Sequence, residues 1–383
     1  MTSLRVSVVM PSYNHAPYLR AAIDSVLAQD YGALDLVVID GGSQDVSVEI
    51  LRSYGGRLAF VSARDRGQAD AINRGFARTT GDILCWLNSD DMFVPGVIPR
   101  VVQAFEDHPD VDFVYGRGWN ISESGEIDDA GVLTLDLWRL IHQRNFIQQP
   151  SCFFRRSLIE RVGPVDESLH YVMDWDLWIR FAAYRGLYVD EFWSYNRVHR
   201  QNKTQSGHFR RWAEIRRMVR RYTDVRWPPV MSLYLLEAIL HRIRGRRVPR
   251  LIEHGLVRVF SLGMRRDMSG RYADGGVGRR FRFSVGNPRG RDRVTLTLSP
   301  LSQYDRSRLG DVPVTIRWRA NTGGAGVFCL RETGTAQYFA ISPGRPSPFV
   351  HVTCRSDHPG ARLGAGAGLP ERRIIGFLDA IEA

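Results

Sequence analysis

The sequence predicts an α/β fold in its first half, with a mostly parallel sheet covered by helices on both faces. The first observation is a series of short continuous apolar runs, as expected for strands that are buried on both sides. The second is that stretches with helical spacing of apolar residues separate these runs, as in successive βαβ units. The predicted strands are 6–10, 34–39, 58–61, 83–87 and 111–115, and the clearest predicted helices are 17–27 and 68–78.

Acidic residues follow two of the predicted strands directly. Asp40 comes after the strand at 34–39 and opens an Asp-Gly-Gly-Ser run, and Asp90 and Asp91 follow the strand at 83–87. Ligands bind outside the carboxyl ends of the strands in parallel α/β sheets, so both clusters are candidate parts of one site. The alternative is that Asp40 only shapes a turn, because Asp and Gly are common turn residues.

Length, charge and cysteine usage limit the class of protein. The chain has 383 residues, 44% of them hydrophobic, and a formal net charge of +11, which favours two domains and anionic partners. Its four cysteines form no CxxC pair, which argues for a reducing compartment and against a zinc site. We find no signal peptide and no apolar run of about 20 residues, so we expect a cytoplasmic protein, with attachment to the inner membrane face left open.

Two further parts follow the first half, and we place the domain boundaries at 1–206, 207–268 and 269–383. Fifteen arginines against four acidic residues in 207–266, interleaved with apolar residues, predict basic amphipathic helices on an anionic membrane surface. The alternative is a solvated basic face or a docking surface for an acidic partner. In the last part, short β-prone runs predict a small β-sandwich-like domain. These runs are 281–285, 294–298, 314–318, 327–330, 338–341 and 349–353.

The run Asn88-Ser89-Asp90-Asp91 is the best candidate metal site. Mg²⁺ and Mn²⁺ prefer carboxylate oxygens and keep open positions for phosphate oxygens. Adjacent carboxylates after a buried strand fit that need. The alternative is that Asp90 or Asp91 only caps the helix that Pro95 opens.

The segment Asp174-Trp175-Asp176 contains the best candidate general base. Residues two apart on a helix do not share a face, so only one of the two carboxylates is expected to reach a given site. Asp176 has Arg180 four residues on, which favours an ion pair, so Asp174 is the predicted base. The alternative role of Asp174 is to cap the start of the helix.

His199 lies in a polar, cationic stretch with Arg200 and Lys203. A histidine in such surroundings could ligate a metal ion or meet a phosphate, and the two cations are candidate diphosphate contacts. The alternative is a structural histidine beside solvated cations.

Six segments together resemble the family 2 glycosyltransferases with the GT-A fold. They occur in the family's order and cover about residues 5–205, so the resemblance is strong. The segments are 6–31, 34–45, 65–91, 148–163, 173–182 and 195–204.

The resemblance implies an inverting glycosyltransferase of the hexosyltransferase type, acting in polysaccharide or cell-surface glycan synthesis. It would take its sugar from a nucleotide diphosphate donor, expected to be UDP-linked, and pass it to a hydroxyl of a glycan or lipid-linked acceptor. Asp174 matches the Asp of the family's Glu-Asp base motif, and Asp90 matches the last Asp of its DxD-type motif, which binds Mg²⁺ or Mn²⁺.

The resemblance also assigns the remaining site residues. The donor contacts are Pro11, Tyr13, Asn14, Asp40, Asp65, Arg66, Gly67, Asn88 and Ser89. The metal contacts are Asp90, Asp91 and His199, with Arg200 and Lys203 on the diphosphate, and the acceptor contacts are Gln148, Gln149 and Trp175.

The sequence departs from the family pattern at two positions. Asn88 stands where many members have the first Asp of the metal motif, so metal affinity is expected to be lower unless Asp91 compensates. Met173 stands where the Glu of the base motif often lies, which removes a second acidic contact to the acceptor.

Three other classes fit the residues less well. A non-catalytic glycan-binding or scaffold protein is the main alternative, and the presence of Asp40, Asp90 and Asp174 argues against it. A dinucleotide-dependent oxidoreductase would carry GxGxxG after the first strand, where this chain has Pro-Ser-Tyr-Asn-His at 11–15. A nucleic-acid binder fits the charge, but no recognition motif accompanies the basic segment.

Overall fold

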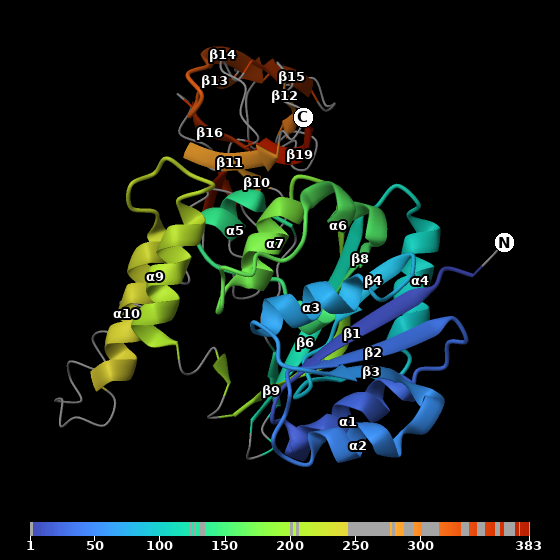
Figure 1. The fold of residues 1–383 in the computed structure, drawn as a ribbon. Coiled ribbons are helices and arrows are strands. Elements are labelled where there is room, and N and C mark those ends of the chain that lie inside the picture. The colour runs from blue at the N-terminus through green and yellow to red at the C-terminus, as the bar shows by residue number, and fades with distance from the viewer. Residues whose placement is uncertain are drawn as a thin grey trace. The chain divides into compact units, whose positions relative to one another are not determined.

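The structure is a computed structural model in which the chain divides into two units (Figure 1). One unit is Met1–Leu135 with Asn145–Met218, and the other is Asp136–Arg144 with Val219–Ala383. The described residues are 3–122, 125, 127–129, 135–199, 202–203, 207–243, 276–277, 280–286, 294–300, 314–330, 337–342, 349–356, 361–363, 372–374 and 376–382.

A mixed β-sheet forms the centre of the first unit. Its strands are β1 (Val6–Ser12), β2 (Leu34–Asp40), β3 (Ala59–Ser62), β4 (Ile83–Trp86), β5 (Met92–Phe93), β6 (Phe113–Ser122), β7 (Ile127–Asp129), β8 (Cys152–Arg155) and β9 (Gly186–Val198). They have the order β3-β2-β1-β4-β8-β6-β9-β5, with β7 on β6. β1 runs parallel to β2 and β4, β2 to β3, and β6 to β9. β8 and β5 run antiparallel to their neighbours.

This sheet confirms the predicted α/β class, but it is mixed where a mostly parallel sheet was predicted, because β5, β7 and β8 pair antiparallel with their neighbours. The five predicted strands correspond to β1, β2, β3, β4 and β6, and the residues of β1 and β4 are buried throughout, as their continuous apolar runs require. The apolar pattern does not predict β5, β8 or β9. β5 and β8 are short, and β9 mixes half-buried polar and apolar residues without a regular alternation.

Helices cover both faces of the sheet. The helices of the first unit are α1 (Ala16–Leu27), α2 (Ser47–Ser53), α3 (Gln68–Phe76), α4 (Val97–Asp107), α6 (Arg156–Val162), α7 (Met173–Phe181) and α9 (His208–Val219), and the last of these does not lie on the sheet (Figure 1). Figure 1 shows α1 and α2 on one side of β1 to β3 and α3 on the other. Successive residues of β1 account for this, because Val8 shares a core cluster with Ile23 of α1, whereas Val9 lies against Gly75 of α3.

The second unit contains α5 (Leu137–His142), α10 (Pro229–Ile243) and the β-rich part. Its strands are β10 (Gly276–Val277), β11 (Arg280–Gly286), β12 (Val294–Pro300), β13 (Val314–Ala320), β14 (Ala325–Leu330), β15 (Gln337–Ile341), β16 (Phe349–Ser356), β17 (Ala361–Leu363), β18 (Arg372–Ile374) and β19 (Gly376–Glu382). The six predicted β-prone runs all fall within these strands.

Most of these strands form two antiparallel sheets, as expected for a small sandwich. The four-stranded sheets have the orders β10-β19-β12-β15 and β11-β16-β13-β14, and β17 pairs with β18. The rings of Phe328 in β14 and Phe339 in β15 stack at 4.3 Å, so the two sheets meet there.

The arginine-rich segment forms helices where its apolar spacing predicts them, in α9 and α10. Its remainder, 244–268, lies outside the described residues, and the boundaries at 206 and 268 stay predictions. Across the part of the chain that the structure describes, no helix combines the length and apolar character needed to cross a membrane.

We expect Gly75→Ala to lower the free energy of unfolding by about 1–3 kcal/mol, because overpacking in a core has that cost. A Cβ at Gly75 would lie 2.2 Å from Val9 Cγ1, so α3 would have to move away from β1. Chemical denaturation of the full chain measures the change. Gly32→Ala is the matched control, because a Cβ at Gly32 meets nothing within 4 Å. Equal unfolding free energies for the two variants would contradict the packing argument.

Candidate functional site

The loops after β1, β2, β4 and β9 meet at one edge of the central sheet. β1, β2 and β4 run in parallel, so their carboxyl ends share this edge, and β9 ends there as well. The contacts that join the four loops are Asn14 N to Ser43 Oγ (2.8 Å), His15 Nδ1 to Ser89 Oγ (2.8 Å) and His199 Nε2 to Asp90 Oδ2 (3.0 Å). Segments far apart in the sequence therefore form one candidate site.

Asp40 ends β2 with a fully buried carboxylate. Its Oδ2 accepts hydrogen bonds from the backbone N–H of Gly42 (3.1 Å) and Ser43 (2.9 Å) and from Ser62 Oγ (2.7 Å). The hydroxyl of Ser43 donates to Oδ1. Asp40 thus fixes the turn at 41–43, and its predicted contact with the nucleotide stays a prediction.

The loop after β1 lies against that turn. Asn14 has a φ of 53°, a left-handed conformation that Asn tolerates better than most residues. Its Oδ1 accepts a hydrogen bond from the N–H of Gln44 at 2.8 Å. Pro11 is buried in β1, whereas the ring of Tyr13 is 55% exposed. Of the three donor contacts predicted in this loop, Tyr13 and Asn14 reach the surface.

Asp65 and Gly67 form the next part of the edge. A Cβ at Gly41 would lie 2.8 Å from Asp65 Oδ2, so the glycine is what allows the carboxylate to approach the turn after β2. Asp65 Oδ1 accepts the N–H of Gly67 at 2.9 Å. The predicted donor contacts at 40 and 65 therefore lie on neighbouring loops.

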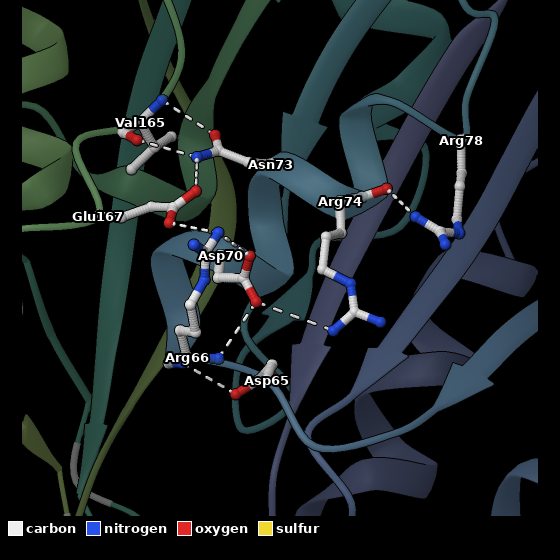
Figure 2. Close-up of polar contacts among 9 residues, drawn as sticks. Asp65, Arg66, Asp70, Asn73, Arg74, Arg78, Val165 and Glu167 are labelled. Atoms are coloured by element: carbon white, nitrogen blue, oxygen red, sulfur yellow. Dashed lines mark hydrogen bonds and ion pairs between the residues drawn. The ribbon is translucent and has the colours of Figure 1, made fainter.

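Arg66 points away into an ion-pair network (Figure 2). Its guanidinium lies 2.9 Å from Asp70 Oδ1 and 2.7 Å from Glu167 Oε2, and its side chain is 74% exposed. Asn73 extends the network, donating to the carbonyl of Val165 and to Glu167. In this structure Arg66 ties α3 to the loop after α6, and its predicted nucleotide contact stays a prediction.

Asn88 is the centre of an amide network. Gln68 Nε2 donates to Asn88 Oδ1 at 2.7 Å, and Asn88 Nδ2 donates to Gln149 Oε1 (3.0 Å) and Asp91 Oδ2 (3.1 Å). An aspartate at 88 would lack this donor and would place another negative charge beside Asp91. Asn88, which departs from the family pattern, therefore suits its neighbours better than an aspartate would.

Asp91 is 2% exposed, and protein donors occupy both of its oxygens. Asn88 donates to Oδ2, and the N–H of Arg197 donates to Oδ1 at 3.0 Å. Burial, together with the neighbouring Asp90 charge, raises the pKa of Asp91 well above its usual range. Asp91 thus joins β9 to the loop after β4, and its predicted role in metal binding stays a prediction.

Asp90 and His199 come together although they are 109 positions apart. The imidazole Nε2 lies 3.0 Å from Asp90 Oδ2, and the buried Nδ1 of His199 has no hydrogen-bond partner among the described residues. The ring of Tyr18 stacks on His199 at 4.8 Å. Two predicted metal contacts are thus adjacent, and the histidine ring is held in place by an aromatic neighbour.

His15 belongs to the same cluster. Its ring centroid lies 6.4 Å from that of His199, and its Nδ1 lies 2.8 Å from the hydroxyl of the buried Ser89. Burial lowers the pKa of His15 below its usual value, although the Asp90 charge acts against this shift. A neutral imidazole is therefore favoured at this position near neutral pH.

The donor set fits a hard divalent cation that takes its other ligands from a bound diphosphate. No group of three or more His, Cys, Asp or Glu side chains is placed to hold a metal ion in the described part of the chain. Asp90 and His199 offer one carboxylate and one imidazole, and Mg²⁺ is commonly bound by one or two carboxylates with substrate phosphates and water. These two residues could hold such an ion.

Lys203 lies among the acidic residues of the site. Burial lowers the pKa of Lys203 to about 8, although the negative charges of Asp65, Glu214 and Asp90 act against this shift. A cation in that position suits a diphosphate beside Asp90. Arg200, the other predicted diphosphate contact, lies outside the described residues.

Asp174 lies in the first turn of α7. Asn145 Nδ2 donates to its Oδ2 at 3.0 Å. Burial raises the pKa of Asp174 above its usual value, although the N–H of Trp175 and the charge of Arg211 act against this shift. Asp176 instead pairs with Arg180 at 3.0 Å, which confirms the ion pair that favours Asp174 as the candidate base.

The predicted acceptor contacts lie in different surroundings. Gln149 donates to the carbonyl of Trp86 at 2.7 Å, within the amide network of Asn88. Gln148 packs on β6, where a Cβ at Gly118 would lie 3.3 Å from its Cγ. Trp175 is 1% exposed and belongs to the core. All three acceptor contacts stay predictions.

The predicted set lacks several polar residues that contact its members, among them His15, Gln68 and Asn145. His15 directly follows the predicted loop and precedes a helix that Pro17 opens, which is the signal that could have found it. Gln68 and Asn145 carry no such signal, because their partners Asn88 and Asp174 are distant in the sequence.

Comparison with known proteins points to one family. Residues 7–163 match the family described as Glycosyl transferase family 2. A PGL/p-HBAD biosynthesis glycosyltransferase of Mycobacterium bovis is 34% identical over 185 residues, which are 47% of this chain and 70% of that protein.

A second relative is an uncharacterized glycosyltransferase of Rickettsia typhi. It is 29% identical over 213 residues, which are 53% of this chain. The chain spans 66% of that relative's length. Among solved structures, residues 1–349 of S. aureus TarS in complex with UDP align with a TM-score of 0.47 at 17% identity, over 64% of this chain and 73% of that one.

We expect the affinity for UDP to fall about tenfold between pH 7 and pH 9, because the favourable charge of Lys203 is lost above its pKa. The ammonium is charged below pH 8 and neutral above it, and only the charged form attracts a diphosphate. Titration calorimetry with UDP and Mn²⁺ measures the change. Lys203→Arg should remove the dependence, because a guanidinium stays charged throughout. The same pH dependence in wild type and variant would show that another group is responsible.

Proposed function

This chain belongs to the family 2 glycosyltransferases, and we propose that it transfers a sugar from a nucleotide diphosphate donor to a hydroxyl acceptor. The observation that carries the proposal is the contact between Asp90 and His199, with Lys203 held near Asp90. A carboxylate, an imidazole and an ammonium from two separate loops meet the chemical needs of a metal-bound diphosphate.

The donor lies, in this proposal, across the loops that follow β1, β2 and β4. Asp90 and His199 would hold Mg²⁺ or Mn²⁺, which neutralises the charge that develops on the leaving diphosphate. Lys203 adds a positive charge to the same group. A fixed cation serves the transition state best, and the stacking of Tyr18 on His199 restrains the ligand ring.

The nucleotide is proposed to be UDP. Uracil recognition by Asp40 would require one of the four internal hydrogen bonds of its carboxylate to be exchanged. Asp40 also contributes indirectly, because it fixes the turn that neighbours Asp65 and the exposed ring of Tyr13.

Asp174 is the proposed general base. Its carboxylate accepts the proton of the acceptor hydroxyl while the hydroxyl oxygen forms a bond to the anomeric carbon and the bond to the diphosphate breaks. A single displacement of this kind inverts the configuration at that carbon. The raised pKa of Asp174 makes the carboxylate a stronger base than an exposed aspartate, and Asn145 orients it.

The acceptor is proposed to be a glycan or a lipid-linked hydroxyl. The mycobacterial relative is named for PGL/p-HBAD biosynthesis, which supports a role in the synthesis of a glycosylated product. The arginines of α9 and the half-exposed ring of Trp227 before α10 support contact with an anionic membrane surface.

Asp174→Asn should lower kcat by about 10²–10⁴-fold, the usual contribution of general base catalysis. The amide keeps the shape of the carboxylate and its contact with Asn145 but cannot take a proton. Release of UDP from UDP-GlcNAc, UDP-glucose and UDP-galactose with Mn²⁺ measures turnover, and titration with UDP measures binding. Asp107→Asn, on the exposed end of α4, is the control. An unchanged kcat in Asp174→Asn would exclude Asp174 as the base.

Asp90→Asn should weaken Mn²⁺ binding at least tenfold, because it removes the proposed carboxylate ligand. Calorimetric titration of Mn²⁺ in the presence of UDP reports binding without reference to turnover. Asp190→Asn, 70% exposed on β9, controls for a general loss of negative charge. Turnover that survives EDTA, together with wild-type Mn²⁺ binding in Asp90→Asn, would refute the metal site.

A further inference from the structure

Glu214 is a buried carboxylate on α9, the arginine-rich helix of the first unit. Its Oε1 accepts hydrogen bonds from three successive backbone N–H groups, those of His170 (2.9 Å), Tyr171 (2.6 Å) and Val172 (3.0 Å). Three N–H groups that converge on one point form a concave anion site. In this protein the site is filled by the carboxylate of Glu214, which lies 42 to 44 positions further along the chain.

The filled site lies directly before α7, the helix that carries the proposed base. α7 begins at Met173, and Val172 at its N-cap has no side chain that could accept an N–H. The start of a helix favours a negative charge, because its first N–H groups lack partners within the helix. Glu214 adds a negative charge from a different helix to those of Asp174 and Asp176 in the first turn, and it bonds the N–H groups that directly precede α7.

Further contacts fasten α9 to the same segment. A Cβ at Gly207 would lie 2.7 Å from the ring of Tyr171, so the chain entering α9 packs closely on that residue. The charge of Arg211 acts on Asp174, and Arg217 Nη2 donates to the carbonyl of Ser168 at 2.9 Å. One face of the basic helix therefore binds the segment that carries the base, and is not available to a membrane.

Glu214 also faces the proposed diphosphate contact. Its charge acts on Lys203 and on His170, and its Oε2 lies 4.0 Å from Arg217, whose side chain is 57% exposed. The carboxylate thus binds the segment before the base and acts through its charge on the cation proposed to meet the leaving group.

We infer that Glu214 is a positioning residue for the transfer reaction, which rests on the proposed function. Its carboxylate fixes the backbone at 170–172 and with it the location of Asp174 relative to the donor. A cap that served only stability would be expected to lower the unfolding temperature and leave turnover of the folded protein unchanged. Positioning predicts a loss in kcat while donor binding persists, because the base is misplaced and the donor loops are intact.

The test uses the full chain and compares Glu214→Ala with Glu214→Gln. Alanine removes every acceptor, whereas the glutamine carbonyl can still accept the three N–H groups. Glu160→Ala, which removes an exposed carboxylate of α6, is the matched control. UDP release from the three UDP-sugars with Mn²⁺ gives kcat and KM, and hydrogen exchange reports on the amides of 170–172.

We expect Glu214→Ala to lower kcat by about 10–100-fold, as small displacements of a reacting group do. KM for the donor and the affinity for UDP should change far less than kcat, because Glu214 acts on the donor site only through its charge on Lys203, and exchange at 170–172 should rise. Glu214→Gln should recover most of the lost kcat, and Glu160→Ala should behave as wild type. Wild-type kcat in a folded Glu214→Ala protein would overturn the inference.

A separate result would refute the proposed function instead. If wild type binds no UDP and releases none from any donor, the transferase proposal fails, whatever the Glu214 variants do. The exchange measurement still decides the contact in that case. Unchanged exchange at 170–172 in Glu214→Ala would show that the carboxylate does not hold the segment, and faster exchange would show that it does.

Discussion

The parallel pairing of β1 with β2 and β4 is the constraint on which the candidate site depends. Buried strands must satisfy their backbone hydrogen bonds with one another, and the apolar residues on both faces of β1 and β4 leave no other partner. The parallel direction brings the three carboxyl ends to the same edge. The loops that leave this edge pack less into the core and carry polar side chains. These groups contact one another, as Asn14 contacts Ser43 and His15 contacts Ser89.

The carboxylates around this edge divide into two groups by their partners. Asp40, Asp91 and Glu214 are buried, and each accepts at least one hydrogen bond from a backbone N–H group, which for Asp91 is that of Arg197 in β9. The main side-chain partner of Asp90 is the titratable His199. That of Asp174 is the neutral amide of Asn145. The first group shapes the loops, which lets the second group keep oxygens for a ligand. Removing a member of the first group would therefore be expected to act on the site through the backbone.

The strands and the acidic clusters after them could be predicted because each depends on a short stretch of sequence. A continuous apolar run identifies β1 or β4, and the six family segments fix the positions of Asp90, Asp174 and His199. β5 and β8 could not be predicted, because each is short and is held by pairing with strands that are distant in sequence. The same limit applies to Asn88, where the sequence alone shows a missing carboxylate and the structure shows an amide that bonds Gln68, Gln149 and Asp91. For α9, charge and amphipathic spacing suggested a membrane surface. That surface stays a prediction, and the tertiary structure adds that Glu214 and Arg217 bind the segment before α7, while the charge of Arg211 acts on Asp174.

The sequence by itself determined the α/β class, the positions of five strands along the chain and the family, because hydrophobic periodicity and local motifs are properties of neighbouring residues. Only the tertiary structure decided which polar groups meet. The contacts between Asp90 and His199 and between Glu214 and the amides of 170–172 join residues that are 109 and at least 42 positions apart. Such contacts depend on how the loops and helices pack around the sheet. A sequence pattern does not give the spatial distance between two residues that are far apart along the chain. That is the physical reason why the residues of this site could be proposed from the sequence, while their division into ligands, base and supporting groups could not.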